Sequence, residues 1–431
     1  MQSHRGSSLA TARFPLALLA AYGAIWILLA VSPSDRRSWI LENLLVVAFV
    51  PTLVLTWRRF AFSKTSYALI ALYLCIHAIG AHYNYRDTPL GEWLRTAFDL
   101  GRNPFDRIGH CAFGLLLAYP LREIIERLAG VRGALVSWLS IVAVMALSSI
   151  FEVLEAAVAE IVSPGAGPAW LGAQGDEWDA QMDMVAACLG AGLAMLIAWL
   201  MERRTATPAA RARASSHTQP FRQRHLLQAL CAIYLVIWII AAIAPLKRDD
   251  WLLENLLVFV FMGLLIATYR RLPFSDLSYV LIFLFLLLHA AGAHYTYSEV
   301  PLGYWAQETF GLRRNHFDRL VHFSFGLLLI QPAREVLMQT GGLRGFWAWC
   351  LPIATVVALS GVFEIVEGVV AWNVQPELGI AYLGTQGDVW DAQKDMVLAL
   401  AGAALALLVA QASRIAAPGL LRHRATTARR S

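Results

Sequence analysis

Carboxylate and histidine side chains recur along this sequence at spacings that a helix places on one face. The pairs are Asp106 with His110, four residues apart, Glu152 with Glu155, three apart, and Asp179 with Asp183, four apart. Residues three or four apart are neighbours on a helix surface. If these stretches are helical, three polar pairs project from three helices, and we expect them to converge on one pocket.

Histidine and carboxylate without cysteine form the ligand set of a borderline or hard divalent ion, such as zinc, manganese, iron or magnesium. The predicted metal ligands are His110, Glu152, Glu155, Asp179 and Asp183. The sequence contains no HExxH metalloprotease signature, so the identity of the ion stays open. The alternative is structural, because such histidines also hydrogen-bond carboxylates or backbone across a helix bundle.

The stretch HAIGAHYNY at residues 77–85 adds a second histidine motif. His77 and His82 are five residues apart, which on a regular helix separates them by about 140° around the axis. Both face one pocket only if the helix ends between them, and Gly80 permits that. We expect His82 to lie beside Asp106 at the helix end and His77 to lie deeper. His82, Asp106 and His110 are the candidate catalytic residues.

The same motifs appear twice. HAAGAHYTY at residues 289–297 repeats HAIGAHYNY with a shift of 212 positions, and the other polar residues repeat at that shift, which indicates a tandem duplication. The second set of catalytic candidates is His294, Asp318 and His322, and the second set of metal ligands is His322, Glu364, Glu367, Asp391 and Asp395. Apolar stretches such as 134–142 and 346–354 differ at most positions, so the shared identities are concentrated at polar residues.

Long apolar runs surround these polar residues. Of the 431 residues 58% are hydrophobic and 15% are charged, which predicts an all-α, polytopic integral membrane protein. The spans expected in the first copy are 14–32, 41–57, 66–82, 107–128, 134–160 and 182–201, each long enough to cross a bilayer. Two such six-helix repeats give about twelve helices inserted in parallel. The loop 171–183, rich in Gly, Asp and Gln, is expected to cap the pocket as a re-entrant segment.

The expected organisation is a first repeat at 1–202, a basic flexible linker at 203–225, a second repeat at 226–412 and a basic tail at 413–431. The positive-inside rule places both termini in the cytoplasm and the polar pairs at the outer face. Arg102 and Arg107 are among the exceptions to that rule. The net charge of +5 lies in short clusters beside apolar runs, and no nucleic-acid motif is present.

Other residue types have simpler interpretations. The five cysteines lie in apolar runs and none is matched at the 212 shift, which argues against disulfides and thiolate metal sites. Gly114, Gly190 and Gly192 are expected to let helices pack closely. Tyr83 and Tyr85, with their counterparts in the second copy, are expected to belong to the interfacial aromatic belt.

A family resemblance is carried by a series of motifs, namely HAIGAHYNY, PLGEW, RNPFDRIGHCAFGLLLAYPLRE, ALSSIFEVLE and LGAQGDEWDAQMDM. Each half of the chain resembles one complete copy of the uncharacterised YjdF-type bacterial inner-membrane proteins, a domain of unknown function. The resemblance implies a multi-pass protein of the bacterial inner membrane and brings no established activity. The order of DRxxH, a glutamate pair and DxxxD is also similar to VanZ-like membrane proteins, although the usual glutamine and arginine of that pattern are not found.

Three classes of function fit these residues. An enzyme would use a metal-activated water or a carboxylate–histidine pair on an envelope lipid or a lipid-linked intermediate. A proton-coupled transporter would use the parallel repeat and a relay of carboxylates and histidines. A non-catalytic binding or structural protein would use neither. Carriers built from parallel repeats place the site between their halves, whereas each half here has its own polar set, which argues against the simplest transporter.

Overall fold

The computed structural model describes residues 9–162, 174, 176, 178–203, 220–373 and 386–416, and within these ranges the chain is helical with no strand. The chain divides into two compact units, Met1–Arg211 and Ala212–Ser431. Twelve of the described helices are long and apolar enough to cross a membrane. The predicted all-α polytopic fold is therefore confirmed.

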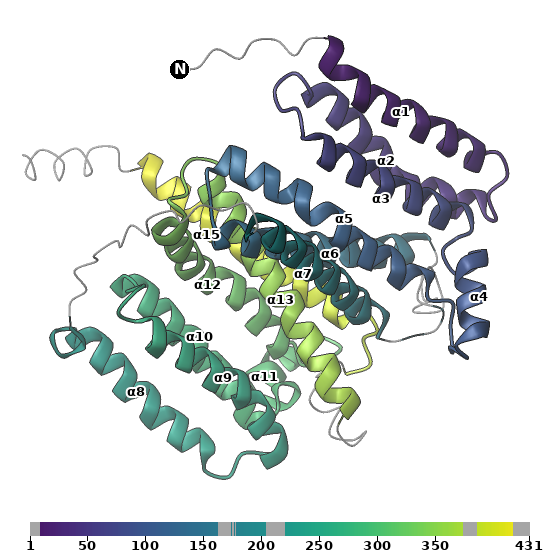
Figure 1. Ribbon diagram of the computed structural model, residues 1–431. Helices are drawn as coiled ribbons and strands as arrows, with labels where there is room; N and C mark the ends of the chain where they lie inside the picture. Colours follow the sequence, from purple (N-terminus) through teal and green to yellow (C-terminus); the bar gives the residue numbers. More distant parts are fainter. Residues whose placement is uncertain are drawn as a thin grey trace, which may run out of the picture. The chain divides into compact units, whose positions relative to one another are not determined.

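The two units contain the same series of helices (Figure 1). The first unit has α1 (Leu9–Ala30), α2 (Arg36–Thr56), α3 (Lys64–His82), α4 (Pro89–Ala97), α5 (Phe105–Ile124), a π-helical turn (Ile125–Ala129), α6 (Ala134–Val162) and α7 (Asp179–Arg203). The second unit has α8 (His225–Ala242), α9 (Arg248–Thr268), α10 (Asp276–Tyr295), α11 (Pro301–Phe310), α12 (Phe317–Gly341), α13 (Trp347–Asn373) and α15 (Asp391–Ala416).

The membrane helices begin and end within a few residues of the expected spans. Short polar side chains fix several starts, because the Asp35 carboxylate accepts a hydrogen bond from the Ser38 N–H at 2.7 Å and the Ser63 hydroxyl accepts one from the Ser66 N–H. The start of α7 differs from the expectation, since the helix already begins at Asp179. Residues 179–183 are therefore helical rather than part of a re-entrant loop, and most of 171–178 lies outside the described residues.

The ends of the predicted linker and tail are also partly helical. Helix α7 continues to Arg203, and a 3₁₀ turn at Phe221–Gln223 precedes α8. Helix α15 continues to Ala416, within the predicted tail. The rest of both segments lies outside the described residues.

Two short helices were not expected from the sequence. Helix α4 and its counterpart α11 have nine and ten residues and lie between membrane helices. Helix α4 has an exposed surface that includes Trp93 and the ion pair of Arg95 with Glu92. These helices are too short to span a bilayer, and a search for runs of about 20 apolar residues passes over them.

In the first unit, α5 packs against α3, α6 and α7, with its most extensive contact on α7. Glycines allow the close approach, because a Cβ atom at Gly114 would overlap the carbonyl oxygen of Ala187 and one at Gly190 would overlap that of Cys111. Gly326 and Gly402 repeat this contact between α12 and α15. The packing role predicted for Gly114 and Gly190 is confirmed, whereas Gly192 faces open space.

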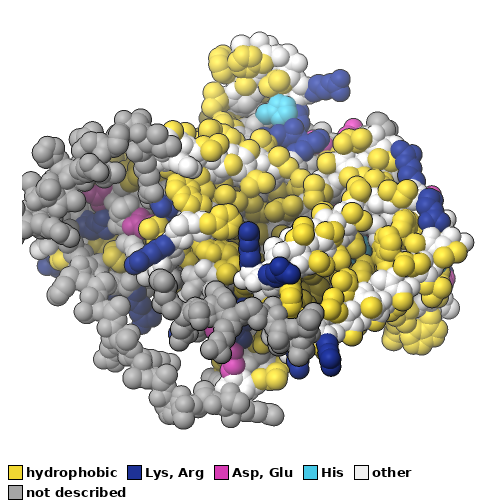
Figure 2. Space-filling view, turned by 90° about the horizontal axis from the view of Figure 1, so that it is seen from above, with side chains coloured by type: hydrophobic (Ala, Val, Ile, Leu, Met, Phe, Trp, Pro, Cys, Tyr) yellow, Lys and Arg dark blue, Asp and Glu magenta, His cyan; other side chains and the backbone are white. Residues whose placement is uncertain are grey.

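Hydrophobic side chains cover much of the visible surface, with Lys and Arg gathered at a few places (Figure 2). Many are highly exposed, including Leu55 and Ile161, each at 79%. Such a surface is costly in water and suits the hydrocarbon core of a bilayer.

Candidate metal centre

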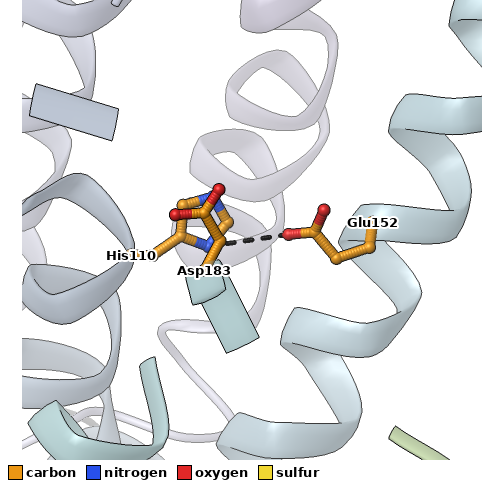
Figure 3. Close-up of side chains that lie close together, drawn as sticks. All are labelled: His110, Glu152 and Asp183. Carbon is orange, nitrogen blue, oxygen red and sulfur yellow. Dashed lines mark ion pairs between the residues drawn. The ribbon is translucent and has the colours of Figure 1, made fainter. Parts of the chain in front are cut away.

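The first unit brings its predicted polar pairs together at one end of the helices. We call Asp106, His110, Glu152, Asp179 and Asp183 the acidic pocket, and their counterparts Asp318, His322, Glu364, Asp391 and Asp395 the second acidic pocket. His110 lies between two carboxylates, with Nε2 at 3.8 Å from Asp106 Oδ1 and Nδ1 at 3.8 Å from Glu152 Oε1. Three helices contribute, because His110 comes from α5, Glu152 from α6 and Asp183 from α7 (Figure 3).

The spacing of these side chains suits a metal ion. One ligand atom from each of His110, Glu152 and Asp183 lies within 4.8 Å of the others. Ligands on opposite sides of an ion with bonds of about 2.0–2.2 Å are about 4 Å apart, so small side-chain movements would close the set. Asp106, Asp179 and Asp183 form a second such group that shares Asp183.

The second unit repeats this arrangement. His322 Nε2 lies 3.6 Å from Asp318 Oδ1, and His322 Nδ1 lies 3.6 Å from Glu364 Oε1. Ligand atoms of Asp318, His322 and Asp395 also lie within 4.8 Å of one another. The two pockets therefore place the same residue types in nearly the same geometry.

Several carboxylate oxygens in the pockets are buried without a hydrogen-bond partner in the structure. They are Glu152 Oε1, Asp183 Oδ1, Glu364 Oε1 and Asp395 Oδ1, and the four side chains belong to residues no more than 4% exposed. Burying an ionised oxygen without a partner is costly, so such groups normally pair with a cation or carry a proton. The pockets therefore have unused ligand capacity directed at the histidine.

The glutamates one turn further along α6 and α13 also belong to this region. Glu155 interacts electrostatically with Glu152 and Asp183. In the second unit, Glu367 likewise interacts electrostatically with Glu364 and Asp395. The metal-ligand groups contain neither Glu155 nor Glu367, so among the described residues these two stand beside the groups rather than in them.

Arginines border each pocket, in a role that sequence alone did not reveal. Arg102 pairs with Asp179 and lies 3.3 Å from Asp176, while Arg107 Nη2 lies 2.5 Å from Asp176 Oδ2. In the sequence, Arg102 and Arg107 stand out only as exceptions to the positive-inside rule, which does not indicate a partner for either. The one signal of a role in the pocket was that both arginines recur at the 212 shift, as Arg314 and Arg319.

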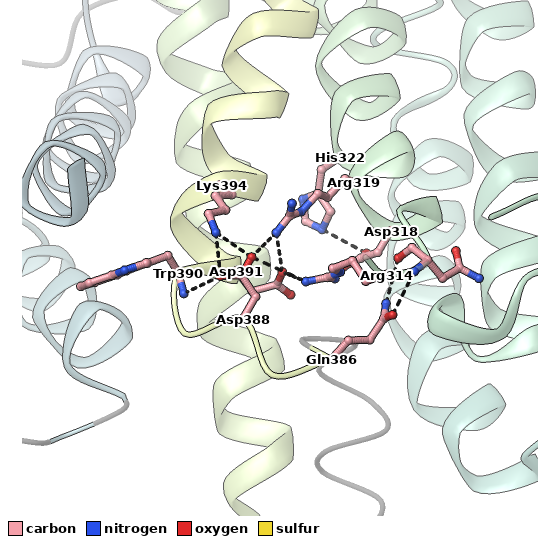
Figure 4. A network of polar contacts seen from close by, with 10 residues as sticks. Arg314, Asp318, Arg319, His322, Gln386, Asp388, Trp390, Asp391 and Lys394 are labelled. Carbon is pink, nitrogen blue, oxygen red and sulfur yellow. Dashed lines mark hydrogen bonds and ion pairs between the residues drawn. The ribbon is translucent and has the colours of Figure 1, made fainter. Parts of the chain in front are cut away.

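We call these arginines and the aspartates that they contact the rim of each pocket. The rim of the second pocket contains an additional cation, Lys394 (Figure 4). Arg314 lies 2.6 Å from Asp391. Arg319 pairs with Asp388 and lies 3.3 Å from Asp391. Lys394 Nζ lies 2.7 Å from Asp388. Burial alone would raise the pKa of Asp388, but hydrogen bonds from Lys394, the Trp390 N–H and Arg319 together lower it. Asp388 is therefore held as a charged anchor at the rim.

An asparagine–glutamine clamp holds the loop before α7 against the start of α5. Gln174 Oε1 accepts a hydrogen bond from the Asn103 N–H at 3.1 Å, and Gln174 Nε2 donates to the Asn103 carbonyl at 3.0 Å. The Asn103 side chain accepts from the Phe105 N–H, fixing the first turn of α5. Gln386 and Asn315 repeat this clamp. The clamp keeps Asp106 close to Asp179 and Asp183.

The expected position of the opening histidine motif is wrong. His82 Nδ1 lies 2.6 Å from the carbonyl oxygen of Leu29, at the end of α1, and His294 Nδ1 lies 2.8 Å from that of Ala241. The metal-ligand groups of the described residues include neither histidine. Both join the ends of neighbouring helices, because the helix continues through Gly80 to His82 without the expected break.

The deeper histidine has a tyrosine partner instead. His77 Nε2 donates to the Glu42 carbonyl at 3.2 Å, so His77 Nδ1 accepts the hydrogen bond of Tyr85 Oη at 2.5 Å. Tyr297 Oη lies 2.5 Å from His289 Nδ1 in the second unit. Burial holds the pKa of the Tyr85 hydroxyl well above its usual value, so it stays a donor. The Tyr85 ring occupies the space that a Cβ atom at position 80 would need, which explains why Gly80 has no side chain. The prediction of an interfacial aromatic is wrong for Tyr85 and Tyr297.

Comparison with known proteins places both halves in one family. The family described as "Predicted membrane protein (DUF2238)" matches residues 14–204 and again residues 226–415. "Inner membrane protein YjdF" of Escherichia coli (strain K12) is 39% identical over 176 residues, which cover 39% of this chain and 80% of that protein. No solved structure matches. The two separate matches confirm the tandem duplication.

Proposed function

This chain belongs to the DUF2238 family of predicted membrane proteins, and we propose that it is a metal-dependent membrane enzyme with one divalent-ion centre in each copy. The observation that carries this proposal is the convergence of His110, Glu152 and Asp183 with buried carboxylate oxygens that lack partners. In the second unit the convergent ligand atoms belong to Asp318, His322 and Asp395, and Glu364 Oε1 lies 3.6 Å from His322 Nδ1.

The histidine geometry supports a particular ligand assignment. His110 Nδ1 faces Glu152, so this nitrogen would bind the ion together with Glu152 and Asp183. Its Nε2–H is then directed at Asp106, which would fix the tautomer and ring orientation. Carboxylate–histidine–metal arrangements of this kind are common in metalloproteins.

The overlapping group of Asp106, Asp179 and Asp183 is the weaker candidate. It has three carboxylates and no histidine, and Arg102 already neutralises Asp179. A cation placed there would compete with the Arg102 guanidinium for Asp179. A cation beside His110 would instead contact carboxylate oxygens of Glu152 and Asp183 that have no hydrogen-bond partner.

A bound divalent ion would supply a Lewis acid and a water of lowered pKa. Glu155, which interacts electrostatically with Glu152 and Asp183, would be the carboxylate that holds a proton next to the bound ion. Asp106 and Asp179 lie in the first turns of α5 and α7, close to the level in a bilayer where the polar part of a lipid or a lipid-linked intermediate lies. A substrate with an apolar anchor and a hydrolysable polar head fits this position.

Elemental analysis of the purified protein tests the proposal. The wild-type chain is expected to retain two divalent ions, His110→Ala and His322→Ala one each, and the double variant none. His82→Ala with His294→Ala is the matched control, because it removes two histidines outside the ligand groups and should leave two ions. A wild-type protein without metal after reconstitution with zinc or manganese, or a double variant that keeps both ions, would contradict the proposal.

Turnover needs its own measurement. Membrane lipids incubated with the wild-type protein and analysed by mass spectrometry should lose a species that stays constant with the double variant. Metal binding without any such loss would reduce the proposal to a binding protein.

A proton-coupled transporter is the second candidate, and one observation favours it. His322 lies between Asp318 and Glu364, and Glu367 interacts electrostatically with both carboxylates, so the four titratable side chains lie in series, as a proton relay requires. A metal-free protein that takes up protons in a substrate-dependent way in vesicles would support this alternative.

A further inference from the structure

A cleft far from the acidic pocket occurs at the same place in both units. In the first unit it has a volume of about 720 Å³ and lies between the first half of α1, the end of α2 and the first half of α3. In the second unit the corresponding cleft has about 810 Å³ between α8, α9 and α10. Both volumes fall within the roughly 300–1,000 Å³ typical of ligand sites.

Most residues that line the second cleft match residues of the first at the 212 shift. Leu53, Ile70 and Leu74 in the first cleft match Leu265, Ile282 and Leu286 in the second. These walls are apolar, as the hydrocarbon chain of a lipid requires. Because the copies differ at many other apolar positions, the cleft is a shared structural feature and not an accident of one copy.

One buried polar group in each cleft has no partner. Tyr22 is 5% exposed and Tyr234 is 8% exposed, both line their clefts, and neither hydroxyl has a hydrogen-bond partner within the described part of the chain. Hydrocarbon cannot satisfy a hydroxyl, so an occupant made only of acyl chain would leave it unpaired. An ester carbonyl would accept its hydrogen bond.

Positive charge borders the same clefts. Arg58 and Arg59, just after the end of α2, and Arg127 of the π-helical turn line the first cleft, and Arg270 lines the second. Arg127 is already paired with Glu123, whereas Arg58 and Arg59 are exposed next to the end of the helix. Guanidinium groups at a membrane surface favour phosphate.

From apolar walls, an unpaired hydroxyl and bordering arginines, we infer that each unit binds one anionic phospholipid. An acyl chain fills the cleft, the ester carbonyl accepts a hydrogen bond from Tyr22 or Tyr234, and the phosphate contacts the arginines. This lipid lies at the opposite end of the helices from the acidic pocket and is a structural ligand rather than a substrate.

Native mass spectrometry in detergent micelles with added dioleoylphosphatidylglycerol tests the inference. We expect two saturable sites per chain, and dioleoylphosphatidylcholine should bind more weakly because its head group has no net charge. Tyr22→Phe should weaken one site about fivefold, as expected for the loss of one hydrogen bond, and adding Tyr234→Phe should weaken both. Arg58→Gln with Arg59→Gln should remove the preference for phosphatidylglycerol at one site.

Tyr83→Phe is the matched control, since it removes a hydroxyl that lines neither cleft. The Tyr→Phe variants keep the ring and the fold, so a loss of binding cannot be attributed to unfolding. Equal lipid affinities in the double tyrosine variant and the control would overturn the inference. A lipid-free dimer in the same spectra would also overturn it, because the clefts would then be covered by a second copy.

Discussion

The acidic pockets of the two copies contain the same residue types, but their rims are held together differently. In the first copy, Arg107 pairs with Asp176. In the second copy, the corresponding Arg319 contacts both Asp388 and Asp391, and Lys394 adds a cation where the first copy has Met182.

This difference separates two requirements. The inside of the pocket needs a histidine between two carboxylates, and both copies place these groups 3.6–3.8 Å apart. The rim needs only enough positive charge to neutralise its aspartates, and several arrangements provide it. The copies should therefore respond alike to changes in the helix packing and differently to changes at the rim.

The largest effect is expected where the copies are most alike. Gly114→Ala and Gly326→Ala each place a Cβ atom against a backbone carbonyl of the facing helix, so each should destabilise its unit by at least about 3 kcal/mol. Thermal unfolding in detergent measures this, with Gly192→Ala as a control that faces open space. Unequal losses of stability for Gly114→Ala and Gly326→Ala would show that the helix packing of the two units differs.

A smaller and unequal effect is expected at the rim arginines. Arg102→Gln leaves the mostly buried Asp179 without its main cation and should cost about 2 kcal/mol. Arg314→Gln should cost about 1 kcal/mol, because Arg319 still contacts Asp391. The same unfolding assay compares them. If Arg314→Gln were the more damaging, the redundancy proposed for the second rim would be wrong.

The smallest effect concerns Lys394. Hydrogen bonds from Lys394 and its neighbours lower the pKa of Asp388, so its stabilising contribution is present above the unfolded pKa and is lost as pH falls through the folded value. Lys394→Met, which copies Met182 of the first unit, should move that loss to higher pH and change stability at pH 7 by about 0.5 kcal/mol. Unfolding between pH 3 and 6 follows it, and identical acid profiles would contradict this role.

Much of the fold could be predicted from the sequence because bilayer spans have a length and a composition that are local properties. The duplication and the convergence of the Asp106, Glu152 and Asp183 regions were also accessible, since helical spacing and the repeat both constrain them. Helix α4 was missed because a nine-residue amphipathic helix leaves no long apolar run.

The errors at the candidate site share one physical origin, which is that the partner of a polar side chain can be distant in sequence. Arg102 meets its partner Asp179 only after the chain has crossed the membrane twice more. Spacing alone also could not show that His82 turns to the end of α1 while Tyr85 turns back onto His77. Local patterns identified the polar residues, and tertiary contacts decided which of them meet.

The most direct test of the central claim is X-ray anomalous scattering from crystals of the protein reconstituted with zinc or manganese. We predict two anomalous peaks per chain, one within about 2.0–2.2 Å of ligand atoms of His110, Glu152 and Asp183, and one at that distance from ligand atoms of His322 and Asp395. Peaks only at His82 and His294, or a fully loaded crystal with no peak in either pocket, would contradict it.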